Sequence, residues 1–163
     1  METVGFIGLG NMGSGMGGNI QKADYPMVVY DIRATAMQPF VTNGARTASS
    51  PAEVARLSDV VFTSLPGPKE VEAVATGAGG VLEGIKPGGI YVDLSTSRPT
   101  LIRQIEPLFR QKGAHVLDAP VSGGRPLPDD FTISRMFRQL IGEENQHFGQ
   151  IAYLRGLQRG LDK

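Results

Sequence analysis

Apolar and polar positions alternate in blocks along most of this chain. Short, continuously apolar runs are typical of parallel strands buried on both faces, and they predict strands at residues 4–7, 26–30, 45–48, 59–65, 89–94 and 114–117. The segments between them predict helices at 12–22, 35–43, 51–58, 68–75 and 99–112, and a short turn of undefined type at 81–85. This alternation predicts a doubly wound α/β domain, in which right-handed crossovers join a parallel sheet covered by helices on both faces.

Serine and proline positions indicate where some helices start and where they are weakened. Ser50 precedes Pro51, and Glu53 follows three residues after the serine, which is the pattern of a capped helix start. Pro39 and Pro107 lie inside predicted helices. We therefore expect an interruption at Pro39 and a kink at Pro107.

The strongest chemical signal is a glycine loop between the first strand and the first helix. Gly8, Gly10 and Gly13 have the spacing G-x-G-x-x-G, which binds a dinucleotide in this strand–helix context. Gly8 allows the tight turn, Gly10 lets a pyrophosphate approach the backbone, and Gly13 lets the helix pack close to the strand. Backbone N–H groups near Asn11 and Met12 would face the phosphates at the positive end of the helix dipole. In a chain with 22 glycines, the alternative is a turn without a ligand.

An acidic residue follows the second predicted strand where a ribose-binding carboxylate is expected. Asp31 lies 18 residues after Gly13, close to the spacing of about 20 in dinucleotide-binding domains. Its carboxylate would accept hydrogen bonds from a ribose diol and repel a 2′-phosphate, which favours NAD over NADP. Arg33 weakens that preference, because a guanidinium pairs with a 2′-phosphate. The alternative role for Asp31 is a helix cap or turn residue.

The first predicted helix contains four glycines, Gly13, Gly15, Gly17 and Gly18. This is unusual, because each costs about 1 kcal/mol relative to alanine in a helix interior. We expect a close approach to the strand or cofactor at Gly13 and Gly15. Nothing in the sequence accounts for Gly17 and Gly18 as well.

Composition narrows the class of protein. The length of 163 residues suits one domain, and 16 basic residues balance 16 acidic ones, so we expect neither a nucleic-acid nor a membrane partner. The absence of cysteine excludes disulfides, a thiol nucleophile and thiolate metal sites. No apolar run is long enough to cross a membrane, and the N-terminus runs directly into a strand without a signal peptide. We therefore expect a cytoplasmic protein.

Several polar or irregular segments follow predicted strands. They are residues 8–13, Asp31, residues 65–66, residues 95–96 and residues 122–124. Ligands of doubly wound sheets bind beyond the carboxyl ends of the strands, so we expect these segments to form one site.

Four of these segments, in order, carry a resemblance to a known family. They are Gly5-Phe-Ile-Gly-Leu-Gly-Asn-Met-Gly13 with Met16 and Asn19, then Leu65-Pro66, Asp93-Leu-Ser-Thr96 with Pro99, and Asp118-Ala-Pro-Val-Ser-Gly-Gly124. Over residues 3–124 the chain resembles the β-hydroxyacid dehydrogenases, which include 3-hydroxyisobutyrate dehydrogenase, tartronate semialdehyde reductase and 6-phosphogluconate dehydrogenase.

The resemblance implies a role for each segment. The pyrophosphate would bind at Gly8, Leu9, Gly10, Asn11, Met12 and Gly13, and the adenosine ribose at Asp31. Leu65 and Pro66 would lie at the nicotinamide ribose and Thr96 at the nicotinamide. Ser122, Gly123 and Gly124 would hold the carboxylate or hydroxyl of a small β-hydroxy acid, a role that suits backbone N–H groups in a concave loop.

The chain departs from the family after Gly124. Family members continue into an all-helical domain with a catalytic lysine and an asparagine four residues on, whereas Arg125-Pro-Leu-Pro128 follows here and the only lysine after Lys112 is Lys163. We therefore predict a dinucleotide-binding domain at 1–124, a divergent tail at 125–163, no second helical domain and no assigned catalytic residue.

The tail has apolar residues at helical spacing at Ile133, Met136, Phe137, Leu140 and Ile141, and again at Phe148, Ile151, Leu154 and Leu157. Two amphipathic helices are expected. They would pack on the domain itself or form a face for another chain, including a second copy. A shifted reading frame or a truncated gene is the third interpretation.

The two histidines are weaker candidates. His115 lies in a predicted strand, where a packed structural role is expected. His147 has Glu143 and Glu144 nearby at helical spacing, but a metal site would need more ligands, so we predict a solvated helix face and no metal.

Two functional hypotheses follow. The first is an NAD(P)-dependent oxidoreductase that transfers hydride between the cofactor and a small β-hydroxy acid such as 3-hydroxyisobutyrate. The second is a nucleotide-binding or partner-binding module without turnover of its own.

Overall fold

The computed structural model describes residues 2–121, which fall within one compact unit, Met1–Val121. Its strands are β1 (Val4–Ile7), β2 (Met27–Tyr30), β3 (Arg46–Thr47), β4 (Val60–Thr63), β5 (Ile90–Asp93) and β6 (His115–Asp118). Its helices are α1 (Asn11–Lys22), α2 (Ala34–Thr42), α3 (Pro51–Leu57), α4 (Pro68–Thr76), α5 (Val81–Gly84) and α6 (Pro99–Gln111). The short turn predicted at 81–85 is therefore a helix.

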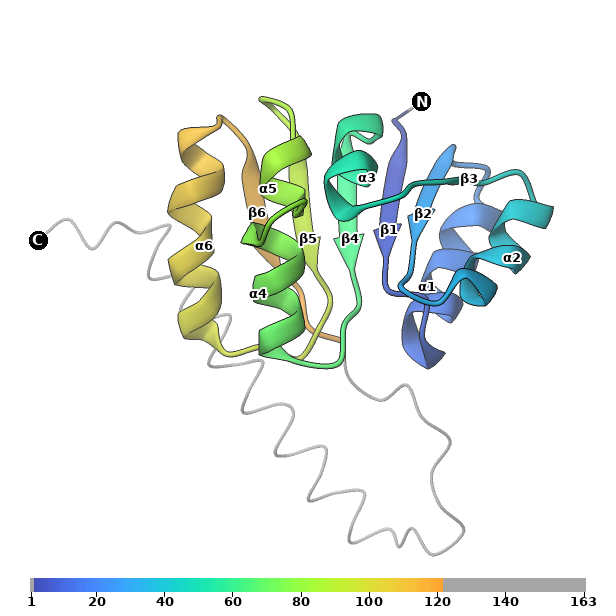
Figure 1. Ribbon diagram of the computed structural model, residues 1–163, viewed down its shortest axis with the longest axis horizontal. Helices are drawn as coiled ribbons and strands as arrows, with labels where there is room; N and C mark the ends of the chain where they lie inside the picture. The colour runs from blue at the N-terminus through green and yellow to red at the C-terminus, as the bar shows by residue number, and fades with distance from the viewer. Residues whose placement is uncertain (1, 122–163) are drawn as a thin grey trace, which may run out of the picture. The chain divides into compact units, whose positions relative to one another are not determined.

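The strands form one sheet in the order β3-β2-β1-β4-β5-β6, and all five neighbouring pairs are parallel (Figure 1). The strand order reverses direction between β1 and β4, which is the crevice where doubly wound sheets bind ligands. The predicted fold class is confirmed: a doubly wound parallel sheet of the dinucleotide-binding kind.

Two apolar cores lie on the two faces of the sheet. One combines strand residues such as Val61 and Tyr91 with α3, α4, α5 and α6. The other combines Phe6 and Val29 with Phe40 of α2 and with partly buried residues of α1. The predicted helices on both faces are thus confirmed, and β1 contributes Ile7 to one core and Phe6 to the other.

Two sequence-based expectations about helices can be compared with the structure. Ser50 caps α3 as predicted, because its Oγ accepts a hydrogen bond of 3.1 Å from the N–H of Glu53. The expected interruption at Pro39 is wrong, since α2 runs through it without a break. Proline removes one backbone donor there, and burial of the neighbouring Phe40, which is 4% exposed, holds the helix on the sheet.

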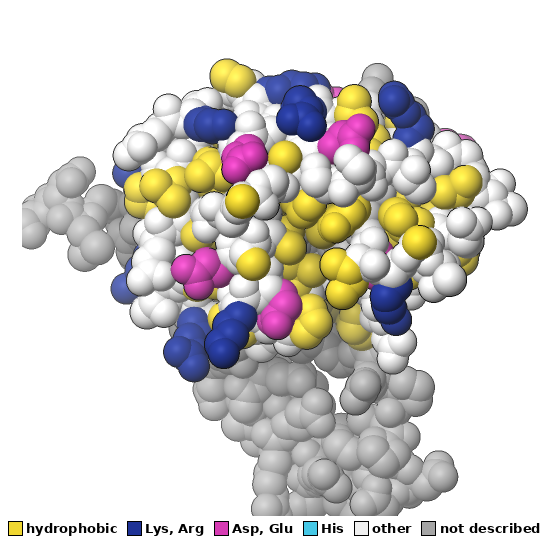
Figure 2. Space-filling view, viewed as in Figure 1, with side chains coloured by type: hydrophobic (Ala, Val, Ile, Leu, Met, Phe, Trp, Pro, Cys, Tyr) yellow, Lys and Arg dark blue, Asp and Glu magenta, His cyan; other side chains and the backbone are white. Residues whose placement is uncertain are grey.

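Within residues 2–121, no helix is both long enough and apolar enough to cross a membrane. Figure 2 shows basic and acidic side chains interspersed over the face of the molecule seen in Figure 1. That distribution agrees with the balanced composition.

Candidate functional site

The glycine loop lies at the carboxyl end of β1, and two of its glycines have no room for a side chain. Gly8 has φ +90°, and a Cβ there would lie 2.3 Å from the carbonyl oxygen of Ser64. A Cβ on Gly13 would lie 1.9 Å from the carbonyl oxygen of Gly8. Both positions therefore require glycine, as the loop motif predicts.

Gly10 differs from these two because nothing lies within 4 Å of the position its Cβ would take. The open space at Gly10 leaves the backbone accessible to a ligand. Helix α1 begins directly after it, with no side-chain cap from the described residues and no acidic residue in its first turn. The first N–H groups of α1 are thus available to an anion, which is the donor set that a pyrophosphate requires.

A close approach to the strand or cofactor was expected at Gly13 and Gly15 of α1, but the structure shows close packing at Gly13 and Gly17. A Cβ on Gly17 would contact the ring of Phe40 at 3.1 Å, whereas Gly15 has nothing within 4 Å. Close packing therefore explains Gly13 and Gly17, because these two lie on the helix face toward the sheet. Gly15 and Gly18 have no packing reason to be glycine among the described residues.

Asp31 joins the end of β2 to the glycine loop. Its Oδ2 accepts a hydrogen bond of 2.7 Å from the backbone N–H of Leu9. Its Oδ1 accepts one of 2.8 Å from the N–H of Arg33, whose Nε lies 3.4 Å from the same oxygen. Asp31 is 8% exposed, and these bonds hold its carboxylate in one orientation. It therefore both stabilises the turn to Arg33 and lies beside the glycine loop.

The side chain of Leu9 lies in the core, whereas that of Arg33 lies at the surface. The Leu9 side chain is 4% exposed and packs in the core with Phe6. Its N–H is already bound to Asp31. The Arg33 side chain is 63% exposed, so its ion pair with Asp31 contributes little to stability and its guanidinium faces solvent.

The loops after β4 and β5 are joined by a single side chain. The Oγ of Ser95 accepts a hydrogen bond of 2.8 Å from the backbone N–H of Leu65. Leu65 is partly buried, whereas Pro66 and Thr96 are exposed. The first of these loops also lies against the start of the glycine loop: the N–H of Ser64 donates to the carbonyl of Ile7, the last residue of β1, at 3.0 Å, and the Ser64 carbonyl fills the space beside Gly8.

The structure therefore brings together the described segments that were predicted to share a site. Asp31 bonds to the glycine loop, the loop contacts residues 64–65, and these contact Ser95 beside Thr96. Ser122, Gly123, Gly124, the tail and His147 lie outside the described residues. The packed role predicted for His115 is wrong, because it begins an edge strand and is exposed.

A buried polar cluster beneath these loops was not predicted from the sequence. Thr63, Asp93 and Asp118 are aligned across β4, β5 and β6 as register partners. The Oγ1 of Thr63 lies 2.9 Å from Oδ1 of Asp93 and 3.0 Å from the hydroxyl of Tyr91. The sequence signal, visible only in retrospect, is a polar residue, Thr or Asp, in the last position of each of these three strands.

Burial changes the acidity of this cluster. It raises the pKa of Asp93, while hydrogen bonds from Ser95 and Thr63 oppose the shift. Burial, and then the nearby charge of Asp93, raise the pKa of Asp118 to about 6. Burial also raises the pKa of Tyr91, so its hydroxyl stays protonated. Asp93 and Asp118 each have one buried oxygen without a hydrogen-bond partner among the described residues.

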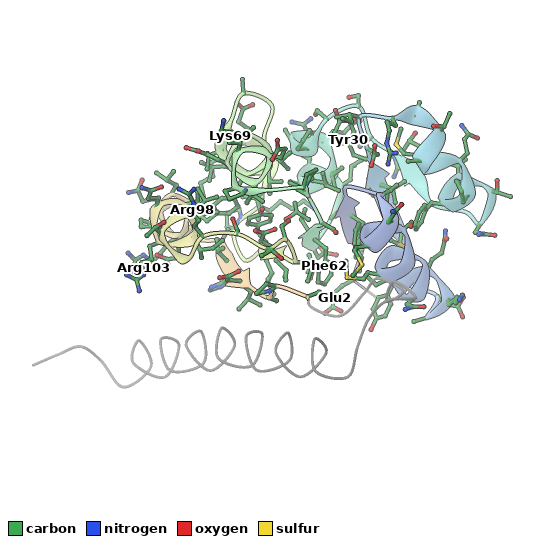
Figure 3. All side chains as sticks on the ribbon, turned by 90° about the horizontal axis from the view of Figure 1, so that it is seen from below. Glu2, Tyr30, Phe62, Lys69, Arg98 and Arg103 are labelled. Atoms are coloured by element: carbon green, nitrogen blue, oxygen red, sulfur yellow. The ribbon has the colours of Figure 1, made fainter. Side chains whose placement is uncertain are left out.

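Within residues 2–121, no three His, Asp or Glu side chains are grouped as a metal site requires. A hollow of about 490 Å³ lies between the N-terminal parts of α4 and α6; Lys69 of α4 and Arg98, which precedes α6, line it and are labelled in Figure 3. Glu70 and Glu72 also line this hollow, and none of the residues predicted for the dinucleotide does.

Comparison with known proteins gives a family match that includes residues 3–124 and extends 13 residues beyond them. A family model described as the NAD binding domain of 6-phosphogluconate dehydrogenase matches residues 3–137. Mitochondrial 3-hydroxyisobutyrate dehydrogenase of Mus musculus is 42% identical over 121 residues, which cover 74% of this chain and 36% of that protein. Cytokine-like nuclear factor N-PAC of Danio rerio is 38% identical over 129 residues, which cover 79% of this chain and 28% of that protein.

A solved structure agrees with these matches. Mycobacterium tuberculosis 3-hydroxyisobutyrate dehydrogenase, determined with L-serine, superimposes with a TM-score of 0.69 at 35% identity. The superposition covers 76% of this chain and 42% of that one. The matched segment thus spans between 28% and 42% of the length of these three relatives.

Proposed function

Because the chain belongs to the family of the 6-phosphogluconate dehydrogenase NAD-binding domain, we propose that it is the cofactor-binding part of an NAD(P)-dependent oxidoreductase of the β-hydroxyacid dehydrogenase type. The resemblance predicted from the motifs is confirmed by that match and by the 3-hydroxyisobutyrate dehydrogenases among its relatives. Residues 1–124 are proposed as the cofactor domain and residues 125–163 as a separate tail.

One observation carries the proposal: the hydrogen bond from Leu9 N–H to Asp31, which holds a carboxylate beside the uncapped start of α1. The Asp31 carboxylate already accepts three hydrogen bonds, and its remaining lone pairs would accept the ribose hydroxyls. The N–H groups after Gly10 would bind the pyrophosphate. Leu65, Pro66 and Thr96 would contact the nicotinamide half, and Ser122, Gly123 and Gly124 the substrate.

The substrate class proposed is a small β-hydroxy acid, such as the 3-hydroxyisobutyrate that appears in the names of the relatives. The cofactor, when bound, supplies the hydride chemistry, and the protein binds and orients it. A general acid–base group typically contributes about 10²–10⁴-fold to the rate. Since no residue of the chain matches the family's catalytic lysine, we expect NAD(P) binding with little or no turnover by this chain alone.

The test measures binding and turnover separately. Calorimetric titration of the 163-residue chain with NAD and with NADP should give saturable binding of at least one of them. Steady-state assays with a panel of β-hydroxy acids should give little or no turnover. Absence of binding of both cofactors would refute the proposed function, and robust turnover by the monomer would refute the need for a missing acid–base group.

A second candidate is a binding module without catalysis. It is favoured by the 38% identity to a relative whose name, cytokine-like nuclear factor N-PAC, describes no dehydrogenase. Both candidates bind the dinucleotide. They differ in whether the protein turns over a hydroxy acid. The compartment also stays a prediction: the sequence favours the cytoplasm, whereas the name of the mouse relative places that protein in mitochondria.

A further inference from the structure

The buried cluster under the site has a defined hydrogen-bond direction. The single hydroxyl proton of Thr63 is donated to Oδ1 of Asp93 at 2.9 Å. Tyr91 lies 3.0 Å from the same Thr63 oxygen, so its hydroxyl must be the donor of that bond. The donors therefore run from Tyr91 to Thr63 to Asp93, and each of these three side chains is fully buried.

Asp93 connects this cluster to the surface loops. Its Oδ1 accepts a second hydrogen bond, of 3.1 Å, from the backbone N–H of Ser95. The hydroxyl of Ser95 in turn accepts the N–H of Leu65 at 2.8 Å. A continuous path thus leads from the sheet interior, through one carboxylate and one hydroxyl, to both loops.

We infer that Asp93 and Ser95 are positioning residues, which set the geometry of the nicotinamide half of the cofactor site by holding the Leu65–Pro66 loop against the loop that carries Thr96. The inference rests on the proposed function, because it takes these loops as the nicotinamide side. Neither residue needs to touch the cofactor. Ser95 is 4% exposed and Asp93 is 0% exposed, so both act through the backbone of their neighbours.

The physical reason is that the two loops belong to different strands. The bond between Ser95 and Leu65 spans 30 residues of sequence, as does the bond between Asp93 and Thr63. Without the Ser95 hydroxyl, the N–H of Leu65 loses its partner in a partly buried place, and the loop must shift to satisfy it. Asp31 and the glycine loop are held by other hydrogen bonds, Leu9 to Asp31 and Ser64 to Ile7, which do not involve Ser95 and remain in its absence.

This separation makes the inference testable with two ligands. NADH contains both halves of the cofactor, and ADP contains only the adenosine and the two phosphates. Calorimetry on the 163-residue chain gives an affinity for each. In the Ser95→Ala variant we expect NADH to bind about 3- to 10-fold more weakly, the loss of one buried hydrogen bond, and ADP to bind within twofold of wild type.

Ser97→Ala is the matched control. Ser97 lies two residues further along the same loop and is 8% exposed, and within residues 2–121 its hydroxyl has no hydrogen-bond partner. Its removal should change neither affinity. The inference is overturned if Ser95→Ala leaves NADH binding unchanged, if it weakens NADH and ADP equally, or if the wild-type chain binds NADH no more tightly than ADP. Failure of the wild type to bind either ligand would instead refute the proposed function itself.

Variants of Asp93 test the interior part of the path. Asp93→Asn keeps an oxygen acceptor for Ser95 and Thr63, so the ratio of NADH to ADP affinity should stay within twofold of wild type. Asp93→Ala removes the acceptor and should lower the ratio as Ser95→Ala does. Combining Asp93→Ala with Ser95→Ala should add little, because both act on one path. If Asp93→Asn and Asp93→Ala lower the ratio of NADH to ADP affinity equally, the role of Asp93 is overturned. Thermal unfolding of each variant identifies any that does not fold.

Discussion

The carboxylate of Asp31 accepts a 2.7 Å hydrogen bond from the backbone N–H of Leu9, across 22 residues of sequence. The bond is buried and joins the end of β2 to the loop that follows β1. One side chain thus has two tasks, because the same group that is proposed to bind the ribose also fixes the loop proposed to bind the pyrophosphate.

Replacing Asp31 should therefore affect both binding and stability. We predict that Asp31→Ala weakens NAD binding by about 1–3 kcal/mol, the scale for a lost charged hydrogen-bond partner, and lowers the free energy of unfolding by a similar amount, because Leu9 N–H is left unpaired. Asp31→Asn, which keeps one acceptor oxygen, should retain most of the stability and lose mainly the ribose contact. Calorimetric titration and urea unfolding measure the two effects. Unchanged stability in Asp31→Ala would contradict the structural task.

The glycines of α1 give a second prediction with an internal control. Gly13→Ala should destabilise the domain by at least about 2 kcal/mol, because its Cβ would meet the backbone oxygen of Gly8, which cannot move aside. Gly18→Ala should instead stabilise it by about 0.4–1 kcal/mol, since nothing lies within 4 Å and alanine favours the helix. Urea unfolding of both variants is the measurement, and stabilisation by both substitutions would show that helix propensity outweighs the clash at Gly13.

Much of the fold was predictable from the sequence, because parallel strands that are buried on both faces consist of continuous apolar runs. The runs at 4–7, 26–30 and 89–94 fall on β1, β2 and β5 with errors of one residue at most at each end. The run at 59–65 was too long, since β4 ends at Thr63. Leu65 is apolar, but its N–H donates to the Ser95 side chain instead of to a neighbouring strand. A hydropathy pattern does not show where backbone pairing between strands ends.

The site was predictable only where its residues share a short segment. Gly8, Gly10 and Gly13 form one local motif, and Asp31 follows at a fixed spacing, so both were found. Asp93 and Ser95 were not assigned structural roles, because their partners Thr63 and Leu65 come from another strand 30 residues away. Register between strands creates such clusters, and register is a tertiary property that local patterns do not contain.

The pairing of Asp93 with Asp118 predicts a dependence of stability on pH. Burial and the Asp93 charge raise the pKa of Asp118 from 3.8 to about 6 in the folded chain. A raised folded pKa means that the stabilising contribution of the protonated form is fully present below about pH 4 and is lost as the pH rises through about 6. Tyr91, buried nearby, stays neutral throughout this range.

Asp118→Asn removes this titration. At pH 7.5 the variant should be more stable than wild type by about 1 kcal/mol, less than the full shift implies because Asp118 is only half-buried and solvent screens its charge. At pH 4 the difference should be close to zero. Urea unfolding at both pH values measures it, with Glu72→Gln on the exposed face of α4 as control. An equal difference at both pH values would mean that the effect is one of packing rather than charge.

The last prediction concerns the choice between NAD and NADP. Asp31 is held by Leu9 and faces the adenosine end of the proposed site, where its charge would repel a 2′-phosphate, whereas the exposed guanidinium of Arg33 beside it would attract one. We predict that wild type prefers NAD, and that Arg33→Ala weakens NADP binding about 5- to 10-fold while NAD binding changes by less than about threefold. Lys86→Ala removes the same charge from an exposed loop that precedes β5, at the amino ends of the strands and so away from the proposed site, and should change both affinities equally. Titration of both cofactors against the three proteins decides the matter: tighter binding of NADP than of NAD by wild type would show that Arg33 outweighs Asp31, and the ribose role given to Asp31 would be wrong.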